Sequence, residues 1–385
     1  MRSSPLLLAA LLAASLSICL ASSAATERAH ALPRAAARPA CPLDPLPSHL
    51  SPTGYSRLLA SEGSRDFVGV EPAHGAYQMW RVDLFECAAA QRVGIVEYAV
   101  SFHQPFYEYL SDRIWAHGAV PLLTWEPWSY ATDVPGAKAD PSAPPLYSLK
   151  EIISGKDDAY ITGFATSIRR FGRPLLLRFA PEMNGNWNSW SESGLAERDG
   201  DYVRAWRHVH DLFRAAKAFN VLWVWAPNVD CGSYCRPLSH FYPGPAYVNV
   251  LALDGYNWGK VHPWTVWRPF GQIFDDSLSE LARLAPEKPE LVSETASTEL
   301  GGSKADWMGG LVAGLDANPN LAGFVWFNLV KETDWRVQSS GSSSAAFRAA
   351  LRSVPESRGA RRLRRGIAAI EARYDAALQV GQLFP

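Results

Sequence analysis

The sequence has no surplus of either charge. Its 37 Lys and Arg residues nearly balance 38 Asp and Glu residues, so the formal net charge is −1. Proteins that bind nucleic acid or an anionic membrane through their overall field usually carry a clear basic excess. The composition therefore predicts no nucleic-acid partner.

Several common catalytic motifs are also missing. The chain has no G-x-S-x-G elbow of a serine hydrolase. Residues 70–77, VEPAHGAY, do not match the G-x-G-x-x-G phosphate loop of dinucleotide-binding sheets. No set of histidines, thiols or carboxylates has the spacing of a zinc site or an EF-hand. We expect no cofactor and no metal.

Long apolar runs are missing after the N-terminus. Residues 1–24 have the pattern of an export signal, with Arg2, an apolar run over 5–21 and small residues near Ala24. The run is shorter than the ~20 residues that a membrane-spanning helix needs. We expect a secreted protein, extracellular or periplasmic, with no membrane association after cleavage. We also expect a monomer.

Cysteine is scarce, with five residues in 385. Four follow the export signal: Cys41, Cys87, Cys231 and Cys235. Export makes disulfides plausible. One arrangement closes the short CGSYC loop at 231–235 and joins Cys41 to Cys87, but four cysteines allow three connectivities.

Short apolar runs alternate with helical patterns through most of the chain. Strands are expected at 66–71, 93–102, 119–128, 174–182, 221–228, 248–259, 289–297 and 321–330. Continuous apolar strands separated by helices are typical of parallel strands buried on both faces. The pattern favours an α/β protein with a (β/α)8 TIM barrel over residues 64–353. An open doubly wound sheet is the alternative.

Two flanking segments differ in composition from the predicted barrel. Residues 25–63 are rich in Ala, Pro, Arg and Ser, which predicts an extended arm. Residues 354–385 carry five arginines between Arg358 and Arg365. They could form a patch for an anionic polymer or a membrane. We favour an amphipathic helix packed on the outside of the barrel, with Ile367, Ile370 and Tyr374 inward.

Carboxylates occur where the expected strands end, which is where a (β/α)8 barrel builds its active site. Glu182 ends the fourth strand and Glu294 lies in the seventh. Two carboxyl groups on either side of a sugar can cleave a glycosidic bond. A separation of about 5–5.5 Å retains the anomeric configuration, and roughly 6.5–9.5 Å inverts it.

Aromatic and polar residues are expected at the same rim. Flat rings could pack against sugars, and the candidates in predicted loops are Trp125, Trp128, Trp187, Trp190 and Trp258. Asn184 could serve a turn, a sugar hydroxyl or both. Arg178, if it points inward, would be a buried cation that needs a carboxylate, plausibly near Glu294.

Two stretches resemble a known family. RFAPEMNGNWNSW (178–190) and VSETAS (292–297) are similar to glycoside hydrolase family 26, a group of (β/α)8 retaining glycosidases known mainly for endo-β-1,4-mannanases. The resemblance implies Glu182 as general acid/base and Glu294 as nucleophile. It also implies that Tyr256 orients the nucleophile and that Trp326 forms the sugar platform.

One position departs from the family pattern. Members often place histidine directly before the acid/base glutamate, whereas this chain has Pro181, which has no side-chain donor. We expect a secreted retaining endo-β-glycanase whose partner is a polysaccharide, β-1,4-linked mannan or a related β-glycan. The alternatives are a mixed-linkage β-glucanase, an exopolysaccharide hydrolase and a non-catalytic polysaccharide-binding barrel.

Overall fold

A computed structural model describes residues 41–43, 66–128, 147–192, 199–229, 236–352, 354 and 356–379. The predicted export signal, most of the predicted arm, Cys231 and Cys235 lie outside the described residues. None of the described helices combines the length and the apolar character needed to cross a membrane.

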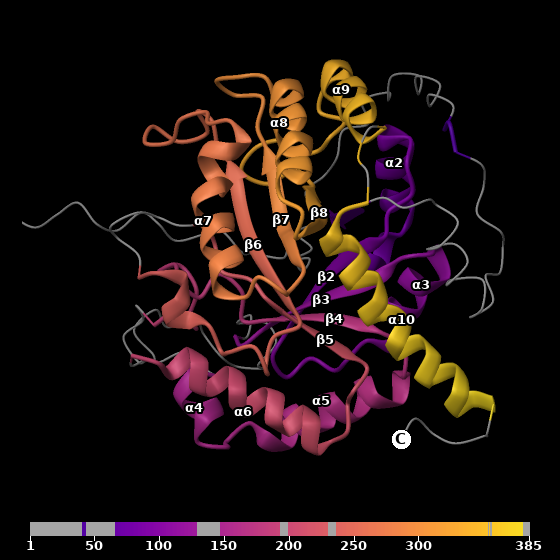
Figure 1. Ribbon diagram of the computed structural model, residues 1–385, viewed down its shortest axis with the longest axis vertical. Coiled ribbons are helices and arrows are strands. Elements are labelled where there is room, and N and C mark those ends of the chain that lie inside the picture. Colours follow the sequence, from indigo (N-terminus) through magenta and orange to yellow (C-terminus); the bar gives the residue numbers. More distant parts are fainter. Residues whose placement is uncertain are drawn as a thin grey trace, which may run out of the picture.

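Eight parallel strands close into a barrel in chain order, with helices around it (Figure 1). The strands are β1 Phe67–Pro72, β2 Ile95–Ser101, β3 Val120–Glu126, β4 Leu175–Phe179, β5 Val221–Trp225, β6 Val250–Asn257, β7 Glu290–Ser297 and β8 Leu321–Asn328. Pairing of β1 with β8 closes the ring, with Phe67 opposite Gly323. The predicted (β/α)8 barrel is confirmed, and the open sheet is excluded.

Helices follow most strands and cover the outer wall. They are η1 Gly75–Gln78, α2 Trp80–Ala89, α3 Glu108–His117, α4 Leu149–Ile153, α5 Asp158–Phe171, α6 Asp201–Ala215, η3 Leu238–Phe241, α7 Phe270–Leu284, α8 Lys304–Ala317, α9 Gly341–Leu351 and α10 Arg358–Gln379. In α5, Ile161, Phe164 and Ile168 recur at helical spacing and are buried. The helix ends at Gly172, whose φ of 77° suits glycine.

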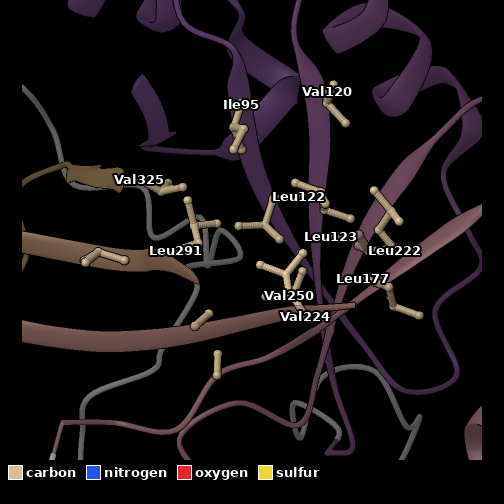
Figure 2. Close-up of a cluster of buried hydrophobic side chains, with 14 of the residues drawn as sticks. Ile95, Val120, Leu122, Leu123, Leu177, Leu222, Val224, Val250, Leu291 and Val325 are labelled. Carbon is tan, nitrogen blue, oxygen red and sulfur yellow. The ribbon is translucent and has the colours of Figure 1, made fainter. Parts of the chain in front are cut away.

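The barrel core is aliphatic. Figure 2 shows Leu122, Leu177, Val250 and Leu291 among the side chains that gather from different strands. Leu122 and its neighbour Leu123 are both fully buried, although they point to opposite faces of β3. Both faces are covered, one by the core and the other by helices, which explains the continuous apolar runs.

Helix α10 lies against the ends where the strands begin. The N–H of Gly359 donates to the carbonyl of Pro319 at 2.9 Å, and Arg358 donates to the Asn320 side chain at 2.8 Å. Both acceptors directly precede β8. At the start of β1, the N–H of Ser357 donates to Asp66 at 2.7 Å.

The two faces of α10 follow the predicted amphipathic pattern. Ile367 and Ile370 are buried, whereas Arg365 is exposed. The side chain of Tyr374 lies outside the described residues. The helix therefore packs on the outside of the barrel, as expected. It lies against the N-terminal ends of the strands as well as the side wall. Arg364 lies over the Phe67 ring, 4.5 Å from its centroid.

Cys41 and Cys87 form a disulfide, with their Cα atoms 4.8 Å apart. This bond attaches residue 41 to helix α2 and confirms one of the pairs that the cysteine spacing allowed.

Candidate active site

Glu182 lies in the loop after β4, in an unusual backbone conformation. Its φ is 55°, and that of Ala180 is 45°. Positive φ is uncommon for residues other than glycine and costs of order 1 kcal/mol. The N–H of Glu182 donates to the carbonyl of Ala226 at 2.8 Å, which fixes the loop to the end of β5. Backbone strain is therefore located at the predicted acid/base.

Two neutral donors hold the Glu182 carboxyl group. The indole N–H of Trp187 donates to Oε2 at 2.8 Å, and the side-chain amide of Asn228 donates to Oε1. Gly185 makes room for the indole, because a Cβ there would lie 2.5 Å from the Trp187 ring. Asn184 exchanges two 2.8 Å hydrogen bonds with the backbone of Asn228. Asn184 therefore positions Asn228, one of the two residues that donate to Glu182.

Burial and the nearby charge of Glu294 raise the pKa of Glu182, although hydrogen bonds from Trp187 and Asn228 oppose the shift. A raised pKa suits a carboxyl group to the role of general acid, which donates a proton to a leaving oxygen.

Glu294 has a different environment. Its Oε2 accepts from Nη2 of Arg178 at 2.8 Å, and its Oε1 accepts from the hydroxyl of Tyr256. The structure thus brings Arg178 and Tyr256, both expected at the site, to the predicted nucleophile. These two donors fix both oxygens of one carboxylate.

Arg178 is a buried cation shared by several carboxylates. Its side chain is 2% exposed, and Nη1 donates to Asp254 at 2.8 Å. Nη2 also donates to Glu97, and Nε donates to Thr124 at 2.8 Å. Burial raises the pKa of Glu97 to about 8, although the Arg178 charge opposes this. Asp254 and Glu97, which the sequence did not indicate, form the inner layer of the site.

Glu71, Glu97 and Glu294 each place a carboxylate oxygen within 4.8 Å of the others. Such a trio could hold a cation, but the Arg178 guanidinium already donates to two of its members. The absence of a metal stays a prediction.

The partly exposed aromatic residues at the mouth are Trp128, Trp187, Tyr256 and Trp258. Trp128 donates to Glu126 at 2.9 Å. Trp258 packs between Tyr256 and Trp335, with ring centroids 5.8 and 5.0 Å away. Trp128, Trp187 and Trp258 come from the loops after β3, β4 and β6, and Tyr256 comes from the end of β6 itself.

Two predicted sugar platforms are wrong. Trp125 lies within β3, not in a rim loop, and is fully buried, stacked 4.3 Å from Phe164 of α5. Trp326 is also fully buried, and its indole N–H donates to the carbonyl of Trp335 at 2.9 Å. Because side chains alternate along a strand, the next residue, Phe327, is the one that packs against Tyr256.

Trp190 is also not at the surface of the mouth. It is 1% exposed, and its indole N–H donates to the carbonyl of Pro181 at 2.7 Å. Its role is to hold the strained loop.

A (β/α)8 barrel whose mouth holds two glutamates, one beside neutral donors and one beside a cation, has the residues that glycoside hydrolysis requires. The comparisons with known proteins agree. Residues 150–308 match the model of glycosyl hydrolase family 26. Endoglucanase H of Acetivibrio thermocellus is 34% identical over 292 residues, which cover 74% of this chain and 30% of that protein. Mannan endo-1,4-beta-mannosidase A and B of Caldalkalibacillus mannanilyticus is 35% identical over 91 residues, or 22% of this chain and 17% of that one.

Solved structures share the fold. The catalytic domain of the Bacillus sp. JAMB-750 endo-β-1,4-mannanase matches with a TM-score of 0.56 at 17% identity, over 79% of this chain and 91% of that chain. The chain spans less than a third of the length of the two curated relatives above. The predicted resemblance is confirmed: residues 150–308 are similar to glycosyl hydrolase family 26, and the barrel fold is shared with a solved mannanase of that family.

Proposed function

We propose that the protein is a retaining endo-β-glycanase that cleaves β-1,4-linked mannan or a related β-glycan by double displacement. The observation that carries this proposal is the unequal pair of glutamates. Glu182 is held by neutral donors and has a raised pKa, whereas Glu294 is held by Arg178. A retaining glycosidase needs one protonated and one ionised carboxyl group.

In the first step, Glu294 attacks the anomeric carbon while Glu182 gives its proton to the leaving glycosidic oxygen. The C–O bond to the leaving sugar breaks, and a glycosyl ester to Glu294 forms. In the second step, Glu182 takes a proton from water, the water oxygen bonds to the anomeric carbon, and Glu294 leaves as a carboxylate.

The surrounding residues serve both steps. Arg178 and Tyr256 orient Glu294 and stabilise it as a leaving carboxylate. Trp187 and Asn228 orient the Glu182 carboxyl group that donates the proton.

A β-glucan is a second candidate substrate. The relative that aligns over 74% of this chain is named an endoglucanase. Pro181 lacks the side-chain donor that the histidine often found at this position in the family would supply, which was expected to shift preference away from mannan. Both observations favour glucose-containing β-glycans over pure mannan.

We also propose that the protein is secreted and acts on its polysaccharide as a monomer. The apolar N-terminal segment and the Cys41–Cys87 disulfide support export, because disulfides persist in oxidising compartments.

The test combines two substitutions with azide. We expect Glu294→Ala and Glu182→Ala each to lower kcat by roughly 10⁴-fold on β-mannan, mixed-linkage β-glucan or carboxymethylcellulose. Azide should rescue Glu294→Ala by attacking from the vacated face and giving an α-glycosyl azide. With an activated aryl β-glycoside, whose phenolate leaves without a proton from Glu182, azide should rescue Glu182→Ala by attacking the glycosyl ester and giving the β-anomer. Wild-type turnover by both variants would contradict the proposal.

A further inference from the structure

Exposed apolar side chains gather at one side of the barrel mouth. Among the described residues, the loops after β6, β7 and β8 carry four large exposed hydrophobic side chains: Trp264, Val266, Leu300 and Val330. Trp264 has the largest exposed fraction, 62%. Exposed apolar clusters of this kind often mark binding surfaces.

A continuous series of rings joins Trp264 to the candidate nucleophile. Tyr256, which bonds to Glu294, packs against Trp258 at 5.8 Å. Trp258 packs against His262 at 5.4 Å. His262 then stacks on Trp264, with centroids 5.0 Å apart and planes within 4°. One face of the Trp264 ring is thus covered by imidazole, and its exposed surface is the opposite face.

The loop that carries this series is held by hydrogen bonds. At its tip, the N–H of Thr265 donates to the carbonyl of His262, and the Thr265 hydroxyl accepts from the N–H of His262, both at 3.1 Å. At its base, the N–H of Lys260 donates to the carbonyl of Leu300 at 2.8 Å. The position of the ring is therefore set before any ligand binds, which lowers the entropy cost of binding.

We propose that the exposed face of Trp264 is a distal sugar-binding subsite for a β-glycan chain that extends out of the catalytic mouth. A pyranose presents a flat set of C–H groups that matches an indole face, and its hydroxyls stay in water. The ring series leads from Glu294 to Trp264 without a break. We therefore infer that the ligand of Trp264 is the same polysaccharide chain whose bond lies at Glu294. This inference rests on the proposed function and adds that long chains bind better than short ones.

The experiment measures binding separately from cleavage. In a Glu294→Ala background, the mobility of the protein is followed in native gels containing mixed-linkage β-glucan, carboxymethylcellulose or β-mannan. We expect Trp264→Ala to raise the dissociation constant for the polymer about five- to tenfold. Trp264→Phe, which keeps a flat ring, should retain part of the affinity. With Glu294 intact, both variants should hydrolyse a short aryl β-glycoside at the wild-type rate.

Phe219→Ala is the matched control, because Phe219 is 46% exposed but lies just before β5, at the opposite end of the barrel. It should bind polymer like the parent protein. Equal polymer affinity of Trp264→Ala and its parent would overturn the subsite while leaving the proposed hydrolase intact. A wild-type protein that neither cleaves nor binds any of the polymers would overturn both. If Trp264→Ala instead abolished self-association and left glycan binding unchanged, the surface would belong to a second copy of the chain.

Discussion

The ends of β4 and β7 each present one glutamate, and their surroundings differ in almost every respect. Glu182 follows its strand in a left-handed backbone conformation, whereas Glu294 lies within β7, where the pairing with β8 shifts register between Val292 and Thr295. Neutral N–H groups of Trp187 and Asn228 hold the first. A guanidinium and a phenol hold the second.

This difference shows how one residue type can take two chemical roles. Hydrogen bonds from neutral donors orient a carboxyl group without supplying the full charge that favours ionisation. An arginine supplies that charge, and burial of Arg178 makes the interaction stronger than it would be in water. The following substitutions test this contrast, beginning with the largest expected effect.

Arg178→Met should abolish the difference between the two glutamates. It leaves Glu97, Asp254 and Glu294 without their shared cation, and loss of one partner from a buried ion pair costs about 3–5 kcal/mol of unfolding free energy. We expect kcat to fall at least roughly 100-fold, because the nucleophile loses a donor. Urea unfolding and steady-state kinetics measure the two effects.

Adding Glu97→Gln and Asp254→Asn to Arg178→Met serves as a control. The triple variant should regain part of the stability because the two most deeply buried unpaired carboxylates are gone, but it should not regain activity. Full activity of Arg178→Met alone would contradict the proposed role of the cation.

Trp187→Phe should shift the pH profile with a smaller loss of rate. The substitution keeps a ring but removes the donor to Glu182, and that hydrogen bond lowers the pKa of Glu182. Its loss raises this pKa further, so Glu182 stays protonated to higher pH. The alkaline limb of kcat/KM should therefore move to higher pH, with kcat reduced about tenfold. An alkaline limb that stayed in place or moved to lower pH would argue against Glu182 as the acid.

Glu126→Gln should change stability more than catalysis. Burial raises the pKa of Glu126 to about 7, so the folded protein binds this proton more tightly than the unfolded chain. Wild-type stability should therefore fall as pH rises from about 4.5 to about 7. The variant lacks this ionisation and should gain about 1–3 kcal/mol over wild type at pH 8, but not at pH 4. Urea unfolding at both pH values checks this, and an equal difference at the two would exclude the ionisation of Glu126 as its cause.

The strand pattern predicted the barrel because each strand is short, apolar and bounded by a helical segment. It also predicted which residues lie at strand ends, since chain order fixes this directly. Glu182 and Glu294 were found in this way, whereas Tyr256 was indicated by the family resemblance and Arg178 as a residue that could point inward; the structure brings all four together at the mouth.

The direction of side chains within a strand could not be predicted. Both faces of a parallel strand are apolar, so Trp125 and Trp326 gave no sign of which way they point. The structure turns both toward the helices. Asp254 and Glu97 were missed for another reason. Their charges are compensated by Arg178, from a strand distant in sequence, and only the closed barrel brings them together.

The placement of α10 has a consequence for how the chain reaches its final form. Its buried face and its hydrogen bonds meet the polypeptide just ahead of the first and the eighth strands. During synthesis, the N-terminal end of the barrel therefore stays uncovered until residues 358–370 have left the ribosome. The candidate acid/base Glu182 is made long before the helix that completes its scaffold.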